Sequence, residues 1–328
     1  MYRLTINSGL KKLKWVGNDL LYSCGLKSLP NQTHGKRILV YHGVTENALT
    51  DINARFISTQ RFEQEISYFK KHFNVVSLKE YIEGAEHPNK LTVAITFDDG
   101  YLNNLTEALP ILEKHQLPAT FFITTIQKEN YPLLWADALD LHRYTSNQPL
   151  QFQEHLYRSV KNEYKNGHSV LKHDLKTTGW QTKKELVDLI IANNTFMNDT
   201  LFSPYFQLMS EKDIQQLSKS EYATIGSHGV YHNCLTQIPI KDAVMELKES
   251  KSYLENLIQK EVNNLAYPDG DYNSALIDEA QKVGYQIQLV VDYLYEKDEA
   301  DTRILPRFGI NPYIRFNNQI RHIIDGKY

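Results

Sequence analysis

The sequence contains little cysteine and no excess of positive charge. Cys24 and Cys234 are its only cysteines in 328 residues, so a framework of several disulfide bonds is excluded. Lysine and arginine number 36 against 39 aspartate and glutamate residues, and the formal net charge is −3. Binding to nucleic acid depends on positive charge that faces the phosphates. We therefore expect no nucleic-acid partner.

Long apolar runs are also absent. The sequence has no run of about 18 apolar residues, the length needed to cross a bilayer. Its first residues also lack the charged, apolar and small-residue pattern of a secretory signal. We expect no transmembrane segment, and a location in the cytoplasm or at the inner face of the membrane. Residues 10–26 place leucines and Trp15 among three lysines. That pattern indicates an ordinary packed helix, with peripheral contact to a membrane surface as the alternative.

The order of apolar and amphipathic segments predicts an α/β protein. Hydrophobic residues make up 41% of the chain, which is enough for a large packed core. Apolar runs at 38–41, 91–97 and 119–123 indicate strands, and the amphipathic segments 59–72 and 241–259 indicate helices. Such alternation is typical of parallel strands covered by helices.

Two segments depart from this alternation. Residues 1–35 precede the first strand and are predicted to form an N-terminal segment with a helix. Residues 36–328 are predicted to form one domain. Within that domain, residues from about 127 to 220 are polar, helix-forming and rich in lysine, asparagine and glutamine. We expect a helical insertion there, as a lid or a small subdomain.

Two adjacent carboxylates, Asp98 and Asp99, stand at the end of the strand 91–97. Successive side chains of a strand point to opposite faces, so the two carboxylates can have different roles. An ordinary Asp-Gly turn after a strand is the alternative explanation.

Two histidines, His228 and His232, follow the predicted strand 222–226 and would lie one helical turn apart if the segment coils. This spacing suits two ligands of one metal ion, although two unrelated surface histidines could share it. Two imidazoles and one carboxylate leave positions open for water and substrate, as in hydrolytic metal sites. We expect one divalent ion, zinc first, and the ligand set also accepts cobalt, nickel or iron.

Three short motifs resemble those of a known family. They are TFDDG at 96–100, SHGVYH at 227–232 and AYPDG at 266–270. Together they are similar to the first three motifs of the polysaccharide deacetylase family, also called the NodB-homology or carbohydrate esterase 4 family. The resemblance covers about 36–126 and 221–312. It implies a distorted (β/α) barrel of seven parallel strands whose site lies at the carboxyl ends of the strands.

The resemblance also implies an activity and a role for each matching residue. The reaction would be the metal-dependent removal of N-acetyl groups from an amino-sugar glycan or a glycan precursor, with Asp98 as the general base. The metal ligands would be Asp99, His228 and His232. The residues that line the substrate groove would be Tyr267, Pro268 and Asp269, with the Asp269 backbone N–H facing the oxyanion.

The sequence departs from the family pattern at two positions. Ala266 stands where the family usually has an arginine that holds the catalytic aspartate, and we predict that Arg307 replaces it. A surface or substrate-contacting arginine is the alternative. The family's late histidine is matched only by His322. However, VYHGV around His42 resembles a motif of the branch that contains poly-N-acetylglucosamine deacetylases, and His42 is therefore predicted to be the general acid.

The insertion offers two further candidates for contact with the substrate. Trp135 is predicted to stack on a sugar face, with packing inside the insertion as the alternative, and Asp137 is predicted to accept a hydrogen bond from a hydroxyl group. Two other functions stay open for the whole chain. One is a deformylase or amidase that acts on a small or nucleotide-linked sugar, and the other is a non-catalytic carbohydrate-binding relative.

Overall fold

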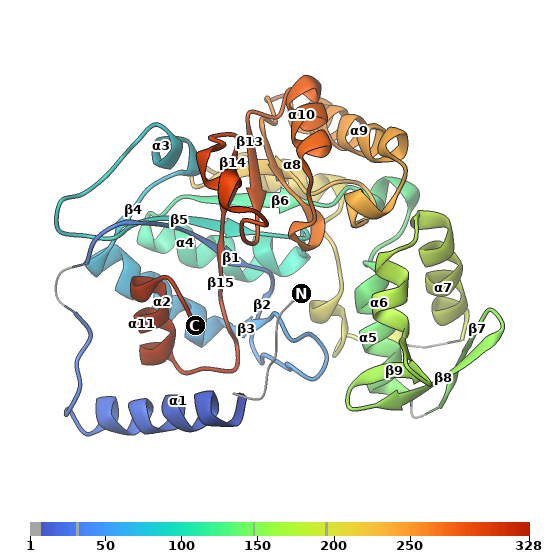
Figure 1. Cartoon of the computed structure of the whole chain (residues 1–328), viewed down its shortest axis with the longest axis horizontal. Helices are drawn as coiled ribbons and strands as arrows, with labels where there is room; N and C mark the ends of the chain where they lie inside the picture. Colours follow the sequence, from blue (N-terminus) through green and yellow to red (C-terminus); the bar gives the residue numbers. More distant parts are fainter. Residues whose placement is uncertain (1–7, 31–32, 147, 194–195) are drawn as a thin grey trace.

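The computed structural model describes residues 8–30, 33–146, 148–193 and 196–328 of the chain (Figure 1). Its main sheet contains parallel strands in the order β14-β13-β12-β11-β6-β5-β1-β15. These strands are β1 Lys36–Tyr41, β5 Thr92–Phe97, β6 Ala119–Ile123, β11 Ala223–Ser227, β12 Asn264–Ala266, β13 Ile287–Val290, β14 Ile304–Pro306 and β15 Phe308–Gly309. The short strand β4 Asn74–Val75 pairs with β5 beside this path.

The last segment of the sheet brings its two ends together. Strands β14 and β15 are separated only by Arg307; β14 pairs with β13, and β15 pairs with β1. The sheet therefore closes almost completely, and the predicted distorted (β/α) barrel is confirmed. The path has eight strands where seven were predicted, because Arg307 divides the closing segment in two.

Helices pack against the outer side of the sheet through one large hydrophobic cluster. They are α2 Thr59–His72, α4 Leu109–His115, α8 Glu211–Leu217, α9 Ile240–Ile258, α10 Ser274–Val283 and α11 Phe316–Asp325. The helix predicted at 59–72 is confirmed. The Ser58 side chain caps it by accepting a hydrogen bond from the N–H of Arg61, and Phe62, Ile66 and Phe69 are buried along one face.

The N-terminal segment contains helix α1 Ser8–Ser23. Its Trp15 indole donates to His322 of α11 at 3.0 Å, and the side chain of Asn318 donates to the Trp15 carbonyl at 3.0 Å. Leu13, Val16 and Leu20 are 69%, 67% and 65% exposed. Helix α1 thus packs on α11 with its polar and aromatic side and turns an apolar side outward. Among the described residues, no helix is long and apolar enough to span a membrane.

Most of the insertion between β6 and β11 forms the mainly green lobe at the right of Figure 1, whereas α8, just before β11, packs on the barrel. It contains α5 Trp135–Thr145, α6 Leu171–Lys176 and α7 Trp180–Ala192, together with an antiparallel sheet of β7 Leu150–Phe152, β8 His155–Val160, β9 Glu163–Asn166 and β10 Ser169–Val170. The sequence did not predict this sheet, because most side chains of β8 are exposed and give no apolar alternation. The insertion has its own hydrophobic cluster, which also includes Ile52, Phe56 and Tyr101 from barrel loops.

One small apolar cluster fills the interior of the barrel. The charged side chain of Arg307 lies against one side of this cluster. Phe122 is the largest residue of that cluster, beside Ala94 and Ala266. A Cβ atom at Gly226 would lie 2.5 Å from two carbons of the Phe122 ring. The Arg307 guanidinium carbon lies 5.7 Å from the centroid of the same ring. The packed interior therefore supports the charged groups above it.

We predict that Gly226→Ala destabilises the fold, because the added methyl group must displace the Phe122 ring in a packed interior. The expected loss is about 1–3 kcal/mol in the free energy of unfolding, measured by urea denaturation. Gly17→Ala is the control, since a Cβ there meets no atom within 4 Å. Equal stability of the Gly226 variant and the wild type would contradict this description of the interior.

Candidate metal centre and catalytic site

The residues singled out by the three motifs meet at one end of the barrel. Asp98 and Asp99 follow β5, His228 follows β11, and His42 follows β1. In a barrel of parallel strands the carboxyl ends open on the same face, so segments far apart in sequence bring their side chains together there.

Asp99, His228 and His232 form a compact buried cluster. Asp99 Oδ1 lies 3.4 Å from His228 Nε2 and 3.3 Å from His232 Nε2. The ligand atoms of the three residues lie within 4.8 Å of one another, and all three residues are buried. This was the ligand set expected from the sequence, and the structure brings it together.

The donor atoms of this cluster suit a divalent cation. Both carboxylate oxygens of Asp99 are buried and accept no hydrogen bond, and the Arg55 guanidinium lies 3.1 Å from Oδ2. His228 Nδ1 donates to the Ala266 carbonyl at 2.7 Å, which leaves the lone pair of its Nε2 directed to the cluster. A buried carboxylate oxygen that accepts no hydrogen bond is costly, and a cation bound at Oδ1 would offset that cost.

Backbone conformation helps to orient two of the three candidate ligands. Asp99 has φ of 76° and His232 has φ of 53°, both in the left-handed region that residues other than glycine rarely adopt. At Asp99 this conformation ends the regular alternation of β5. Its side chain can therefore turn to the two histidines while Asp98 keeps a different direction.

Asp98 is held by a bidentate ion pair with Arg307. Arg307 Nη1 lies 2.6 Å from Asp98 Oδ1, and Nη2 lies 2.7 Å from Oδ2. The two residues are 3% and 6% exposed. Burial raises the pKa of Asp98, but the Arg307 guanidinium and nearby His228 lower it by more, so that the pKa lies below its usual value. The arginine predicted in place of the missing family arginine thus contacts the predicted base.

His42 is half-buried at the end of β1. Burial and the charge of Arg55 lower the pKa of His42 to about 4, although Asp99 and Asp98 act in the opposite direction. The ring is close enough to these groups to sense their charges, and it is neutral near pH 7. His322, the other histidine considered, lies on α11 beside Trp15.

The third motif lies differently from the prediction. Tyr267 is fully buried, and its hydroxyl donates to Gln288 Oε1 at 2.5 Å. Pro268 is buried as well. The two side chains are therefore packed inside the protein and have no open surface for a sugar. Asp269 has φ of 56° and accepts a 2.6 Å bond from Lys176 of the insertion helix α6.

The two residues predicted to contact substrate from the insertion are buried. Trp135 is 1% exposed; its indole N–H donates to the His232 carbonyl at 3.3 Å, and Lys183 Nζ lies 5.0 Å from its ring centroid. No face of this ring is open to stack on a sugar. Asp137 is 2% exposed and accepts from the Tyr101 hydroxyl at 2.7 Å. Both predictions of substrate contact are incompatible with this burial.

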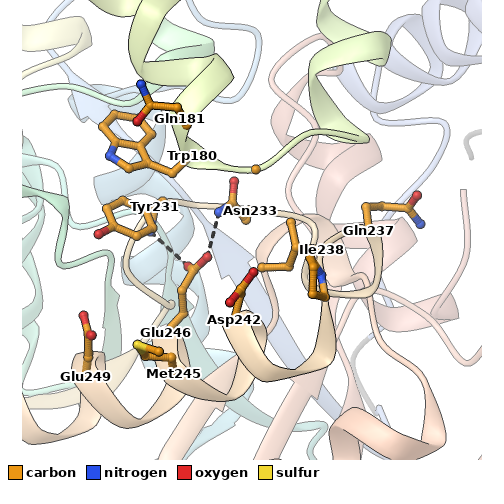
Figure 2. A pocket seen from close by; sticks show the side chains of 12 residues that line it. Trp180, Gln181, Tyr231, Asn233, Gln237, Ile238, Asp242, Met245, Glu246 and Glu249 are labelled. Atoms are coloured by element: carbon orange, nitrogen blue, oxygen red, sulfur yellow. Dashed lines mark hydrogen bonds between the residues drawn. The ribbon is translucent and has the colours of Figure 1, made fainter.

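A second group of supporting residues was missed in the sequence. Glu246 of α9 accepts from Asn233 Nδ2 at 2.6 Å and from the N–H of Tyr231 at 3.2 Å (Figure 2). Lys183 of α7 is fully buried and donates to Asn233 Oδ1 at 2.6 Å; burial lowers its pKa to about 8. These contacts fix the segment that carries both histidines. Glu246 lies on the same buried face of α9 as Ala243 and Leu247. A charged residue on an otherwise apolar helix face was the sequence feature that could have predicted this buried contact.

A pocket of about 380 Å³ lies beside this segment (Figure 2). Trp180 of α7 and Tyr231 stack at its edge with ring centroids 5.0 Å apart, and Glu246 and Ile238 also line it. The pocket is thus formed jointly by the insertion and the barrel.

The chain is similar in sequence to polysaccharide deacetylases. The sequence model of the family described as Polysaccharide deacetylase matches residues 85–288. One relative is YxkH of Bacillus subtilis (strain 168), whose name describes it as a polysaccharide deacetylase. It is 20% identical over 279 residues, which cover 84% of this chain and 71% of that protein.

Solved structures share the fold. The Streptococcus pyogenes deacetylase PplD, in complex with acetate, aligns with a TM-score of 0.55 and 18% identity over 86% of this chain and 94% of its own. IcaB from Ammonifex degensii aligns with a TM-score of 0.55 and 16% identity over 89% of this chain and 97% of its own. At these identities the likeness concerns the architecture of the barrel.

We predict that His228→Ala and His232→Ala each lower metal content and activity together, because two of the three protein ligands are imidazoles. Metal content is measured by elemental analysis of the purified proteins, with His322→Ala as the control. Affinity should also fall as the pH drops through the imidazole range, since protons compete for the same nitrogen atoms. Full metal occupancy in both variants would refute the ligand assignment.

Proposed function

The chain belongs to the polysaccharide deacetylase family, and from this premise we propose that it is a metal-dependent hydrolase that removes N-acetyl groups from an amino-sugar glycan or a glycan precursor. One observation carries the proposal. The buried Asp99, His228 and His232 cluster, in which Asp99 Oδ1 faces both imidazoles and accepts no hydrogen bond, lies directly beside the paired carboxylate of Asp98.

The proposal assigns the cation to Asp99, His228 and His232. A divalent ion bound there supplies a Lewis acid that polarises the acetamide carbonyl and makes water acidic enough to react near neutral pH. Zinc is the expected ion, and cobalt, nickel or iron also suit one carboxylate and two imidazoles.

Asp98 takes the proton from the attacking water in this proposal. His228 Nε2 lies 4.0 Å from Asp98 Oδ2, so the base stands next to the proposed ligands without being one of them. Arg307 holds both carboxylate oxygens in place and keeps the group ionised at neutral pH, as a base must be. The backbone N–H of Asp269 is the proposed donor to the oxyanion.

The leaving nitrogen needs a proton as the C–N bond breaks, and we assign this step to His42. Its ring is neutral near pH 7 in the free protein, because its pKa is lowered to about 4 by burial and by Arg55. His42 can therefore act as an acid only after Asp98 has passed on to it the proton taken from the water, which also returns Asp98 to its ionised form. The pairing of Tyr41 with Phe97, the residues just before His42 and Asp98, supports this assignment.

The family assignment supports a carbohydrate as the proposed substrate class. A screen of N-acetylated amino sugars, with acetate release measured on protein of known metal content, tests the proposal. Formate release in place of acetate would favour the deformylase alternative. Sugar binding without release of either acid would favour the non-catalytic alternative.

We predict that the two neighbouring carboxylates can be separated by substitution. Asp98→Asn should retain the metal and lose turnover on the order of 100-fold or more, because a general base is removed. Asp99→Asn should weaken metal binding itself. Elemental analysis and turnover are measured on the same samples, and far-UV circular dichroism verifies folding. Equal loss of metal in both variants would contradict the division of roles.

We predict that Arg307→Lys moves the acid limb of the pH–rate profile to higher pH. Arg307 lowers the pKa of Asp98 through a two-pronged contact that lysine cannot reproduce. The pKa should therefore rise toward its ordinary value, and the base becomes protonated at a higher pH. Arg303→Lys is the control, because Arg303 pairs with Asp301 and Asp278 on the surface. An unchanged acid limb would remove Arg307 from this role.

We predict that His42→Ala retains the metal and lowers turnover roughly 100-fold or more, since the leaving amine loses its acid. His322→Ala should remain close to wild type, because that ring packs against α1. Turnover and metal content are compared for the two variants. A His42 variant with wild-type turnover would eliminate this residue from the mechanism.

A further inference from the structure

Arg55 lies outside the three motifs and yet contacts the proposed metal ligand Asp99. It belongs to the loop between β2 Val44–Thr45 and β3 Ile57–Ser58. Its Nη1 lies 3.1 Å from Asp99 Oδ2. Its side chain is 31% exposed, whereas that of Asp99 is fully buried. A cation this close to a metal ligand requires a physical explanation.

The other side of the guanidinium contacts a second buried carboxylate, that of Asp137 on the insertion helix α5. Arg55 Nη2 lies 3.3 Å from Asp137 Oδ1 and 3.1 Å from the Tyr101 hydroxyl. Asp137 is held in turn by the Tyr101 hydroxyl at 2.7 Å and by Asn53 Nδ2 at 3.0 Å. Arg55 therefore bridges a carboxylate of the barrel and a carboxylate of the insertion.

This bridge determines which oxygen of Asp99 is available. Arg55 lies against Oδ2, whereas Oδ1 is directed to the two histidine nitrogens. A carboxylate without such a partner can bind a cation through both oxygens. With Arg55 in place, Asp99 presents one oxygen.

The same bridge also reduces the repulsion between the Arg55 guanidinium and a divalent cation bound to Asp99. A guanidinium beside a ligand of a dication repels that dication unless a negative charge balances it. Asp137 is the buried negative group on the far side of Arg55, and its position is fixed by Tyr101 and Asn53.

We infer that Arg55 is a positioning residue that holds Asp99 with a single oxygen toward the cation, and that Asp137 balances the charge of Arg55 so that a divalent ion can bind. The inference rests on the proposed metal site, and it makes the affinity of that site depend on a residue of the insertion. It concerns the groups around the ligands and adds nothing to the ligand set.

A double-mutant cycle on metal affinity tests the charge balance. Zinc affinity is measured by competition with a chromophoric chelator at pH 8, above the pKa of about 7 to which burial raises Asp137. Asp137→Asn should weaken binding about 10-fold or more, because the charge of Arg55 is no longer balanced. Arg55→Gln should change affinity only a few-fold, and adding it to Asp137→Asn should recover most of the loss. Wild-type affinity for Asp137→Asn, or no recovery in the double variant, would overturn the inference.

Asp140→Asn is the matched control. Asp140 lies on the same helix and pairs with Lys172 at 2.6 Å, so this substitution removes the same charge outside the bridge. Its zinc affinity should stay close to wild type. An equal loss in the Asp137 and Asp140 variants would show a general effect of charge and would also overturn the inference.

The coordination of Asp99 is tested with cobalt. The visible absorption of the Co²⁺-loaded protein reports coordination number, and Arg55→Gln should alter the spectrum because Asp99 is then free to use both oxygens. An unchanged spectrum would contradict the positioning role, and this measurement decides alone if Asp137→Asn does not fold. Failure of the wild-type protein to bind zinc or cobalt would instead refute the proposed function. Binding by the wild type with unaltered variants would refute only this inference.

Discussion

Buried negative charge is the constraint on which the arrangement of this site depends. A carboxylate removed from water is costly unless an opposite charge or several hydrogen-bond donors meet it. Four such groups surround the site: Asp98, Asp99, Asp137 and Glu246. Arg307 from the closing segment meets Asp98, and Arg55 from an early loop lies between the next two. The fourth accepts bonds from the segment that carries the histidines. Each of these pairings fixes the position of a loop or strand end near the site, where regular strand and helix contacts do not reach.

Part of this arrangement could be predicted because it depends on local patterns. The strand before Asp98 and the helix over 59–72 follow from apolar periodicity, and the short spacing of the histidines suggested one cation. Arg307 could be named because the family arginine was missing and one arginine stood before the last predicted strand. The burial of Trp135 could not be predicted, since an aromatic residue in the first turn of a helix gives no indication of which side will be covered. Arg55 lies in an irregular loop, where residue spacing carries no information about contacts.

The insertion is closely integrated with the site. Its residues reach two barrel segments. Trp135 bonds to the His232 carbonyl and Lys183 to the neighbouring Asn233, whereas Lys176 bonds to Asp269. These are polar contacts, most of them buried, and separating the insertion from the barrel would expose or orphan the groups that make them. The insertion therefore supports the candidate site structurally. Its Trp135 stabilises the left-handed backbone of His232 by donating to the His232 carbonyl.

The closing segment at 304–309 both completes the barrel and orients Asp98, so folding and assembly of the candidate site are linked. Strand β15 pairs with the first strand of the barrel, and Arg307, just before it, contacts a residue 209 positions earlier in the chain. Contacts of such sequence separation tend to form late and slowly. Until they form, Asp98 is an ordinary carboxylate with no fixed direction. Orientation of the proposed base and completion of the barrel are therefore one event, and a partly folded chain has not yet assembled the candidate site.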